Sequence, residues 1–190
     1  SLCRAGILIR RFDRYIDEHG IAHRLAVEDA CQLSNRYPSN KYLLTAEQCS
    51  EALLTQVFSP RIAAPEVFRQ FVYAWLTGNG DLHAKNLSIV ENRKGQYELS
   101  PIYDIPSTAP YGDKSMALLL SGKKDGLSRR RFLTFAHNIG VSSRVAEHVL
   151  EEVLTGTEHL AEQAREELPF DSHRMKELLK VLKNRRRSLL

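Results

Sequence analysis

Apolar residues at helical spacing precede a short polar stretch near the middle of the chain. Positions 67, 68, 71, 72, 75 and 76 are all apolar, and this recurrence every three or four residues predicts a helix over residues 65–76. Pro65 suits the first turn of that helix, and Gly78 and Gly80 are placed to end it. The polar stretch is therefore expected to follow directly on a buried helix.

The pattern changes to strand-like alternation after the polar stretch. Residues 87–90 and 96–99 read as two strands, and the residues between them, Asn-Arg-Lys-Gly at 92–95, read as their turn. A hairpin brings its far end back toward its start. We therefore expect the residues just beyond position 99 to return toward the polar stretch.

The remaining segments are predicted to be mostly helical. Before the polar stretch the pattern predicts, in chain order, a hairpin at 6–25, a short helix at 27–34, a loop at 35–44 and a helix from a capping box at Thr45 to about Phe58. After residue 127 it predicts four helices, at 128–140, from 142 or 143 to 156, at 158–168 and at 171–183. The segment 105–126 reads as a long irregular loop, in which 116–120 is expected to form a short strand packed beneath the site.

These elements predict a single α+β domain that is mainly helical and carries a small antiparallel sheet. The chain has 190 residues, 43% of them apolar, which is enough for one substantial core. Its net charge of +4 is too modest to require a nucleic-acid partner. Cys3, Cys31 and Cys49 lack metal-ligand spacing, which favours buried reduced thiols in a cytoplasmic protein. There is no run of about 18 apolar residues, the length that would predict a membrane span.

The polar stretch has the residue types that phosphoryl transfer from a nucleotide requires. It reads Gly-Asn-Gly-Asp-Leu-His-Ala-Lys-Asn at 78–86, and Tyr103 and Asp104 follow the predicted hairpin. In protein kinases one Asp orients the attacking hydroxyl and accepts its proton, while an Asn and a second Asp hold magnesium ions on the phosphates. Asp81, with Asn86 five positions later and Asp104 beyond the hairpin, has this pattern.

A plain turn is the competing interpretation, because Asp, Asn and Gly gather in turns and an Asp-x4-Asn spacing is common by chance. Three features favour chemistry: the position between two strongly apolar segments, Asp104 at the hairpin exit, and a His and a Lys within the loop. Lys85 could neutralise phosphate charge. For His83 we favour a structural hydrogen bond over proton transfer.

Five segments, in this order and spacing, resemble the HipA family of bacterial serine/threonine kinases, the toxins of HipBA-type toxin–antitoxin pairs. They are Ile-Arg-Arg-Phe-Asp-Arg at 9–14, Val-Glu-Asp-Ala-Cys-Gln at 27–32, Gly-Asp-Leu-His-Ala-Lys-Asn at 80–86, Pro-Ile-Tyr-Asp-Ile at 101–105 and Gly-Lys-Lys at 122–124. The resemblance implies a protein-kinase-like C-terminal lobe with a small antiparallel sheet around the active site, and ATP and Mg2+ as cofactors. It implies Asp81 as the catalytic residue and Asn86 and Asp104 as the ligands of Mg2+.

The same resemblance implies five residues in contact with the nucleotide: Phe12, Asp13, His83, Lys85 and Tyr103. The first two would lie at the hinge beside adenine and ribose, and the other three would line the nucleotide pocket. Arg10 departs from the family pattern, which commonly has Glu there, and this leaves the adenine contacts open.

An ATP kinase also needs a Gly-rich loop and a strand lysine ahead of its hinge. Before Gly78 the chain has only Gly6, Gly20 and a single lysine, Lys41, from which no such loop can be built. We therefore expect a C-terminal kinase lobe whose nucleotide-covering lobe is either truncated or carried on another polypeptide. Little or no kinase activity is expected of this chain alone.

The resemblance suggests an organisation and partners for the 190-residue domain. Residues 1–25 would be a hinge-proximal hairpin, 65–125 the catalytic and metal-binding region, and 126–190 a helical subdomain. A DNA-binding antitoxin and a protein substrate are implied; the family's known substrate is an aminoacyl-tRNA synthetase for glutamate, which the resemblance does not assign to this chain. The basic runs 129–131 and 183–187 read as solvated charge or as an electrostatic contact with DNA or an acidic partner.

Two other functions stay open. Small-molecule phosphotransferases of the aminoglycoside or choline kinase type use a similar Gly-Asp-Leu-His loop that ends in Asn, with a later metal-binding Asp. A degenerate lobe could instead be a non-catalytic binding module. The segments 11–14 and 28–32 favour the HipA type, and the intact Asp81, Asn86 and Asp104 argue against degeneration.

Overall fold

The helix that leads into the polar stretch, α3 (Pro60–Leu76), is the centre of the core in a computed structural model that describes residues 8–190. Its inward face buries the aromatic rings of Phe68, Phe71 and Trp75. The helix begins earlier than the predicted position 65. Pro60 occupies its first turn and Pro65 lies inside it, so the sequence prediction chose the wrong one of two prolines that both suit a helix start.

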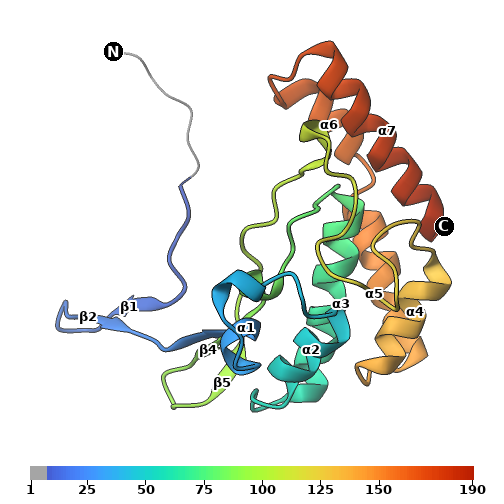
Figure 1. Cartoon of the computed structure of the whole chain (residues 1–190). Coiled ribbons are helices and arrows are strands. Elements are labelled where there is room, and N and C mark those ends of the chain that lie inside the picture. The colour runs from blue at the N-terminus through green and yellow to red at the C-terminus, as the bar shows by residue number, and fades with distance from the viewer. Residues whose placement is uncertain (1–7) are drawn as a thin grey trace, which may run out of the picture.

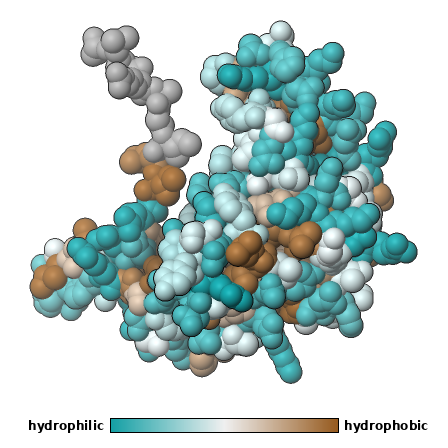
Figure 2. All heavy atoms as spheres, viewed as in Figure 1, coloured by the Kyte–Doolittle hydropathy of each residue, from teal (hydrophilic) through white to brown (hydrophobic). Residues whose placement is uncertain are grey.

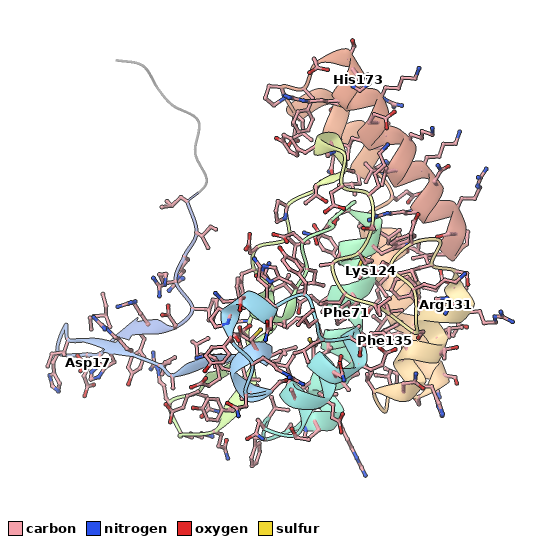
Figure 3. The ribbon with its side chains drawn as sticks, in the orientation of Figure 1. Asp17, Phe71, Lys124, Arg131, Phe135 and His173 are labelled. Atoms are coloured by element: carbon pink, nitrogen blue, oxygen red, sulfur yellow. The ribbon has the colours of Figure 1, made fainter. Side chains whose placement is uncertain are left out.

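Two helices from the C-terminal half, α4 (Arg129–Asn138) and α5 (Ser143–Gly156), pack against α3. The ring centroids of Phe71 and Phe135 lie 5.1 Å apart in an edge-to-face arrangement, and Figure 3 shows these two side chains between α3 and α4. The aromatic residues at helical spacing therefore form the core that the pattern predicted.

A three-stranded antiparallel sheet lies beside this core, in the order β3 (Val27–Asp29), β4 (Ser88–Glu91), β5 (Tyr97–Leu99). The predicted hairpin of β4 and β5 is confirmed, with Val90 opposite Glu98. The prediction of one short helix over 27–34 is wrong in its first half. Residues 27–29 pair with β4, and the helix α1 (Ala30–Leu33) starts only where Asp29 forms a capping box with Gln32.

A second hairpin, β1 (Arg14–Ile16) and β2 (Ala22–Arg24), projects from the body of the molecule (Figures 1 and 2). The Asp17 carboxylate organises its turn by accepting hydrogen bonds from the backbone N–H groups of His19 and Ile21. Within the described residues the hairpin buries no side chain in the core, and Ile16 is 70% exposed. The predicted hairpin is confirmed over residues 14–24, whereas residues 8–13 form no strand and residues 6 and 7 lie outside the described range.

The chain between the sheet and α4 is irregular, as predicted, but the strand expected at 116–120 does not form. Leu119 and Leu120 each take part in a single isolated bridge, with Thr45 and Lys123 respectively. Met116, Leu118 and Leu120 are nonetheless buried against the main core. The apolar run therefore predicted burial correctly. Its conformation is set by two separate contacts, one with Thr45 and one with Lys123.

The other helices follow the predicted order, with α7 longer than predicted. They are α2 (Ala46–Leu54), α6 (Leu160–Glu167) and α7 (Ser172–Leu189), with short 3₁₀ turns at Pro38–Asn40, Ala84–Asn86 and Ala109–Tyr111. Helices α6 and α7 form a smaller second core cluster with Ala109 (Figure 1). The mainly helical fold with small antiparallel sheets confirms the predicted fold class.

Two further expectations concern thiols and membranes. Cys31 and Cys49 are free and buried, and burial raises the pKa of the Cys49 thiol to about 12. Cys3 lies outside the described residues. Among the helices described, none combines the length and apolar character needed to cross a membrane.

Candidate functional site

The site loop, residues 78–86, leaves the end of α3 through two glycines with different tasks. Gly78 has a φ of +76°, a left-handed conformation that side chains rarely adopt. At Gly80 an added Cβ would lie 2.6 Å from the Thr108 hydroxyl and 2.7 Å from the Ser115 carbonyl. Glycine is therefore required at position 80 for the loop to pass close to the 107–115 segment, and this approach fixes the start of the loop.

Asn79 holds the loop from inside. Its side chain is fully buried, its Oδ1 accepts the N–H of Asp81 at 2.9 Å, and its Nδ2 donates to the carbonyl of Pro106 at 2.7 Å. Both ends of the amide are therefore satisfied, as a buried polar group requires. Asn79 ties the backbone at position 81 to the segment that follows Asp104.

Asn86 brings the two acidic segments together. Its Nδ2 donates to the backbone carbonyl of Asp81 at 3.2 Å and to that of Asp104 at 3.3 Å. The side chain is 5% exposed, and Gln70 of α3 donates to its backbone carbonyl at 3.3 Å. The hairpin return expected from the sequence therefore brings Asp104 to the site loop, and the contact is made through an amide and two backbone carbonyls.

The backbone of Asp104 is in the left-handed region, with a φ of +53°. A residue other than glycine held there stores strain, and such residues gather at functional sites. Its side chain is exposed at the surface, while Tyr103 beside it is half-buried. The Asp104 backbone is therefore held by Asn86 while its side chain remains at the surface.

The donor set formed by Asn86 and Asp104 suits a hard cation. Both Nδ2 hydrogens of Asn86 are committed to carbonyls, which leaves Oδ1 as an oxygen ligand. Mg2+ prefers oxygen ligands, and proteins hold it with one or two side chains together with substrate phosphates. Over residues 8–190 no group of three or more His, Cys, Asp or Glu side chains could hold a metal ion.

Asp81 is held by a residue that the sequence analysis did not single out. The Tyr42 hydroxyl donates to Asp81 Oδ1 at 2.8 Å, and this hydrogen bond, followed by burial, raises the pKa of Tyr42. The tyrosine therefore stays protonated and acts as a donor. The Asp81 side chain remains 43% exposed, so its carboxylate is accessible at the surface.

Lys41 is the second residue that the sequence analysis missed. Its Nζ lies 2.8 Å from His83 Nε2, and a lysine ammonium can only donate in this contact. Burial and the Lys41 charge lower the pKa of His83, so the ring is neutral and carries its proton on Nδ1. That Nδ1 is buried and has no hydrogen-bond partner among the described residues. The structural hydrogen bond expected for His83 is therefore present, with Lys41 as its partner.

Three of the residues expected around the nucleotide, Phe12, Lys85 and Tyr103, lie close together. The rings of Phe12 and Tyr103 are 5.6 Å apart. The Tyr103 hydroxyl donates to the Lys85 carbonyl at 2.8 Å and accepts from Ser88 at 2.6 Å. Burial raises the pKa of Tyr103, while a hydrogen bond from Arg11 lowers that of Asp13.

The structure thus brings together Asp81, His83, Asn86 and Asp104, and joins Tyr103 to Phe12. The Asp13 carboxylate pairs with its neighbours Arg11 and Arg14 instead of with a residue of the site loop. A signal for Lys41 was available, since it is the only lysine ahead of the loop. Tyr42 and Asn79 carried no comparable signal, because their roles depend on distant contacts.

Comparisons with known proteins identify the family of the chain. A family model described as the HipA-like C-terminal domain matches residues 2–161. "Putative kinase Y4mE" of Sinorhizobium fredii is 32% identical in an alignment of 146 residues that covers 73% of this chain and 34% of that protein. A "Putative kinase" of Haemophilus influenzae is 27% identical in an alignment of 160 residues that covers 73% of this chain and 46% of that protein.

A solved structure shares the fold. It is the complex of HipA, HipB and operator DNA from the Shewanella oneidensis MR-1 toxin–antitoxin system, and its matching chain superposes with a TM-score of 0.71. The match has 20% sequence identity and covers 92% of this chain and 47% of that one. The chain spans less than half the length of each of these three proteins.

Proposed function

Since the chain belongs to the HipA-like C-terminal domain family, we propose that it is the catalytic lobe of a serine/threonine protein kinase that uses ATP. The observation that carries this proposal is the Asn86 amide, which joins the backbones of Asp81 and Asp104. It gathers the three residue types of phosphoryl transfer from separate segments. Because the match covers less than half of each relative, the activity is proposed for a longer polypeptide that includes a lobe covering the nucleotide.

Asp81 is proposed as the catalytic residue that orients the acceptor hydroxyl and takes its proton. Tyr42 holds one carboxylate oxygen at 2.8 Å, and no hydrogen bond within residues 8–190 uses the other. The second oxygen can therefore meet an incoming hydroxyl. Tyr42 acts on this step as a positioning residue, since it touches Asp81 and not the reacting atoms.

Asn86 and Asp104 are proposed to hold Mg2+ through Asn86 Oδ1 and the Asp104 carboxylate. The ion would supply positive charge to neutralise the phosphates during transfer. The protein's own part is to fix the two ligands. The two hydrogen bonds of Asn86 Nδ2 orient its amide, and the left-handed backbone orients Asp104.

Five residues are proposed to contact the nucleotide: Phe12, Asp13, His83, Lys85 and Tyr103. The contact between the Phe12 and Tyr103 rings supports an aromatic surface beside Asp104. Lys85 is exposed and can reach phosphate, and Lys41 adds a second positive charge next to His83. These contacts would hold ATP on the hinge side of Asp81.

The partners proposed for the whole protein are a protein substrate and a DNA-binding antitoxin. The neighbouring Shewanella protein is found with HipB and operator DNA, which supports a toxin–antitoxin assignment by analogy. The substrate proposal extends to an aminoacyl-tRNA synthetase only by that same analogy.

The test uses the polypeptide that carries this domain at its natural length. ATP consumption is measured with protein acceptors and, in parallel, with an aminoglycoside and with choline, in the wild type and in Asp81→Ala and Asp104→Ala. Asp125→Ala, a carboxylate on the long loop outside the site, is the matched control.

We expect phosphorylated serine or threonine in a protein acceptor, a loss of a hundredfold or more in both site variants, and no change in the control. Turnover of only the small molecules would assign the alternative phosphotransferase function. Turnover that is unchanged in both site variants would end the kinase proposal and leave the non-catalytic binding module.

A further inference from the structure

A groove with an apolar floor lies where the end of α5 meets α6 and α7, away from the candidate site. Its volume is about 350 Å³, and it is lined by leucines from three helices: Leu76, Leu160, Leu179 and Leu182. Leu76 and Leu182 are nearly fully buried, while Leu160 and Leu179 are half-buried and form its walls. The space is large enough to accept one or two apolar side chains of a ligand.

The rim of this groove is basic. Four cationic side chains line it, Arg165, Lys180, Lys183 and Arg186, against a single carboxylate, that of Glu158. The ion pairs that the structure describes for α7 join Glu177 to Lys114 and Arg174 to Asp171. The rim cations of α7 take part in neither pair, and their charge faces an opening that a ligand can fill.

The groove is preformed, because α7 is fixed to the rest of the molecule. The Arg185 guanidinium lies 4.1 Å above the Trp75 ring and donates to the Trp75 carbonyl at 2.9 Å. Trp75 Nε1 donates to Ser188 at 3.2 Å, and Arg186 donates to the Leu154 carbonyl at 2.8 Å. A ligand would therefore bind without the cost of ordering the helix.

From this charge complementarity we propose that the groove binds an acidic amphipathic peptide segment of a partner protein. Apolar side chains of the segment would enter the leucine-lined floor, and its carboxylates would face Lys180, Lys183 and Arg165. This is the helix-in-groove mode of recognition combined with pairing of acidic residues by a basic rim. The surface over α6 and α7 is otherwise largely hydrophilic, as Figure 2 shows, so the apolar floor is a local feature.

The combination of floor and rim favours a peptide over other anionic partners. DNA would pair its phosphates with the rim but would gain nothing from four leucines. An anionic membrane favours apolar side chains that protrude from the protein, whereas these leucines line a hollow.

The inference goes beyond the proposed kinase function and does not depend on it. Five of the eleven lining residues come from α7, residues 172–189, and together with Arg165 they lie outside the part that the family model matches, 2–161. A failed kinase assay would therefore not overturn the peptide-binding proposal, and a failed binding titration would not overturn the kinase proposal.

The test is a binding titration by fluorescence anisotropy, with the polypeptide at its natural length. The probe is a fluorescein-labelled helical peptide with leucines on one face and glutamates on the other. Lys180→Glu combined with Lys183→Glu should weaken binding about tenfold or more. Lys176→Glu combined with Arg187→Glu makes the same charge change on exposed positions of the same helix outside the lining, and should change affinity less than twofold.

A second experiment tests the contribution of the apolar floor to binding. A peptide with serine in place of leucine should bind at least tenfold more weakly. The Leu179→Ser protein should bind the original peptide more weakly, and a thermal melt of this variant should show an intact fold. The proposal is overturned if the peptide does not bind, or if both double variants lose affinity equally. It is also overturned if duplex DNA or vesicles of anionic phospholipid displace the peptide and bind more tightly.

Discussion

Asn86 and Arg185 are buried to nearly the same degree, but substitutions around them are expected to act differently: on activity around Asn86 and on stability around Arg185. Asn86 is 5% exposed and joins the two acidic segments of the site, while Arg185 is 4% exposed and joins α7 to α3. Each holds together segments that are distant in the sequence. They differ in what remains unpaired around them.

Around Arg185 the polar groups are satisfied. Its guanidinium donates to the carbonyls of Trp75 and Lys114 and covers the Trp75 ring, and although burial lowers its pKa to about 10 it stays charged near neutral pH. Around Asn86 and His83 two polar atoms have no hydrogen-bond partner among residues 8–190: Asn86 Oδ1 and the buried His83 Nδ1. Satisfied polar groups stabilise a fold, whereas an unsatisfied polar group at a site marks a position where a bound ligand or ion can supply the missing partner.

The largest effect is expected at the site, on activity and not on stability. Asp81→Asn keeps the size of the side chain and removes the carboxylate, so phosphoryl transfer by the natural-length polypeptide should fall a hundredfold or more. The free energy of unfolding should change by less than about 0.5 kcal/mol, since the side chain is 43% exposed. A large loss of stability in urea would show that Asp81 is structural.

The next effect is expected at the contact between α7 and α3, on stability and not on chemistry. Arg185→Met keeps the apolar stem but leaves the carbonyls of Trp75 and Lys114 without a donor, which should lower the free energy of unfolding by about 2 kcal/mol. Lys176→Met, exposed on the same helix, is the matched control and should be neutral. Unfolding of both variants at the same urea concentration would contradict a stabilising role for Arg185 between α7 and α3.

A smaller effect is expected at Tyr42, which positions the catalytic carboxylate. Tyr42→Phe removes the hydroxyl that donates to Asp81 at 2.8 Å, and kcat should fall about tenfold while KM for ATP stays within twofold. Tyr37→Phe, an exposed tyrosine on the same loop, should change neither constant. Equal effects of the two substitutions would remove Tyr42 from the site.

The smallest effect is the pH dependence of the Lys114–Glu177 pair, which ties the long loop to α7. The hydrogen bond from Lys114 lowers the pKa of Glu177 below its ordinary 4.5 in the folded state. The pair therefore stabilises the fold above pH 4.5, and this contribution is lost as the pH falls through the folded pKa. Glu177→Gln should be less stable than wild type at pH 7, and the difference in the free energy of unfolding should shrink as the pH falls below 4.5, while Glu166→Gln on α6 should match wild type throughout.

The sequence predicted the elements whose signal is local. The helical spacing of 67–76, the turn at 92–95 and the capping box at Thr45 each specify their own structure, and all three are present. The strand expected at 116–120 does not form, because Leu119 pairs with the distant Thr45 and Leu120 turns back onto Lys123, and the apolar run alone does not encode either contact.

The site divides in the same way. Asp81, Asn86 and Asp104 could be chosen from residue type and spacing, because phosphoryl transfer restricts both. Lys41 and Tyr42 reach the site across about 40 positions of sequence, through contacts with His83 and Asp81. Lys41 could have been suspected as the only lysine ahead of the loop, whereas the residue type of Tyr42 fits many other roles and only the fold could select it.

The most direct test of the central claim, that Asn86 and Asp104 form one metal-binding site, is a titration with Mn2+ followed by electron paramagnetic resonance in the presence of a non-hydrolysable ATP analogue. Asp104→Asn tolerates the left-handed backbone and removes only the charge, and Asp125→Asn on the long loop is its control. Our account predicts that Mn2+ binds at least tenfold more weakly to Asp104→Asn and unchanged to Asp125→Asn. Equal Mn2+ affinity in the wild type and Asp104→Asn would contradict it.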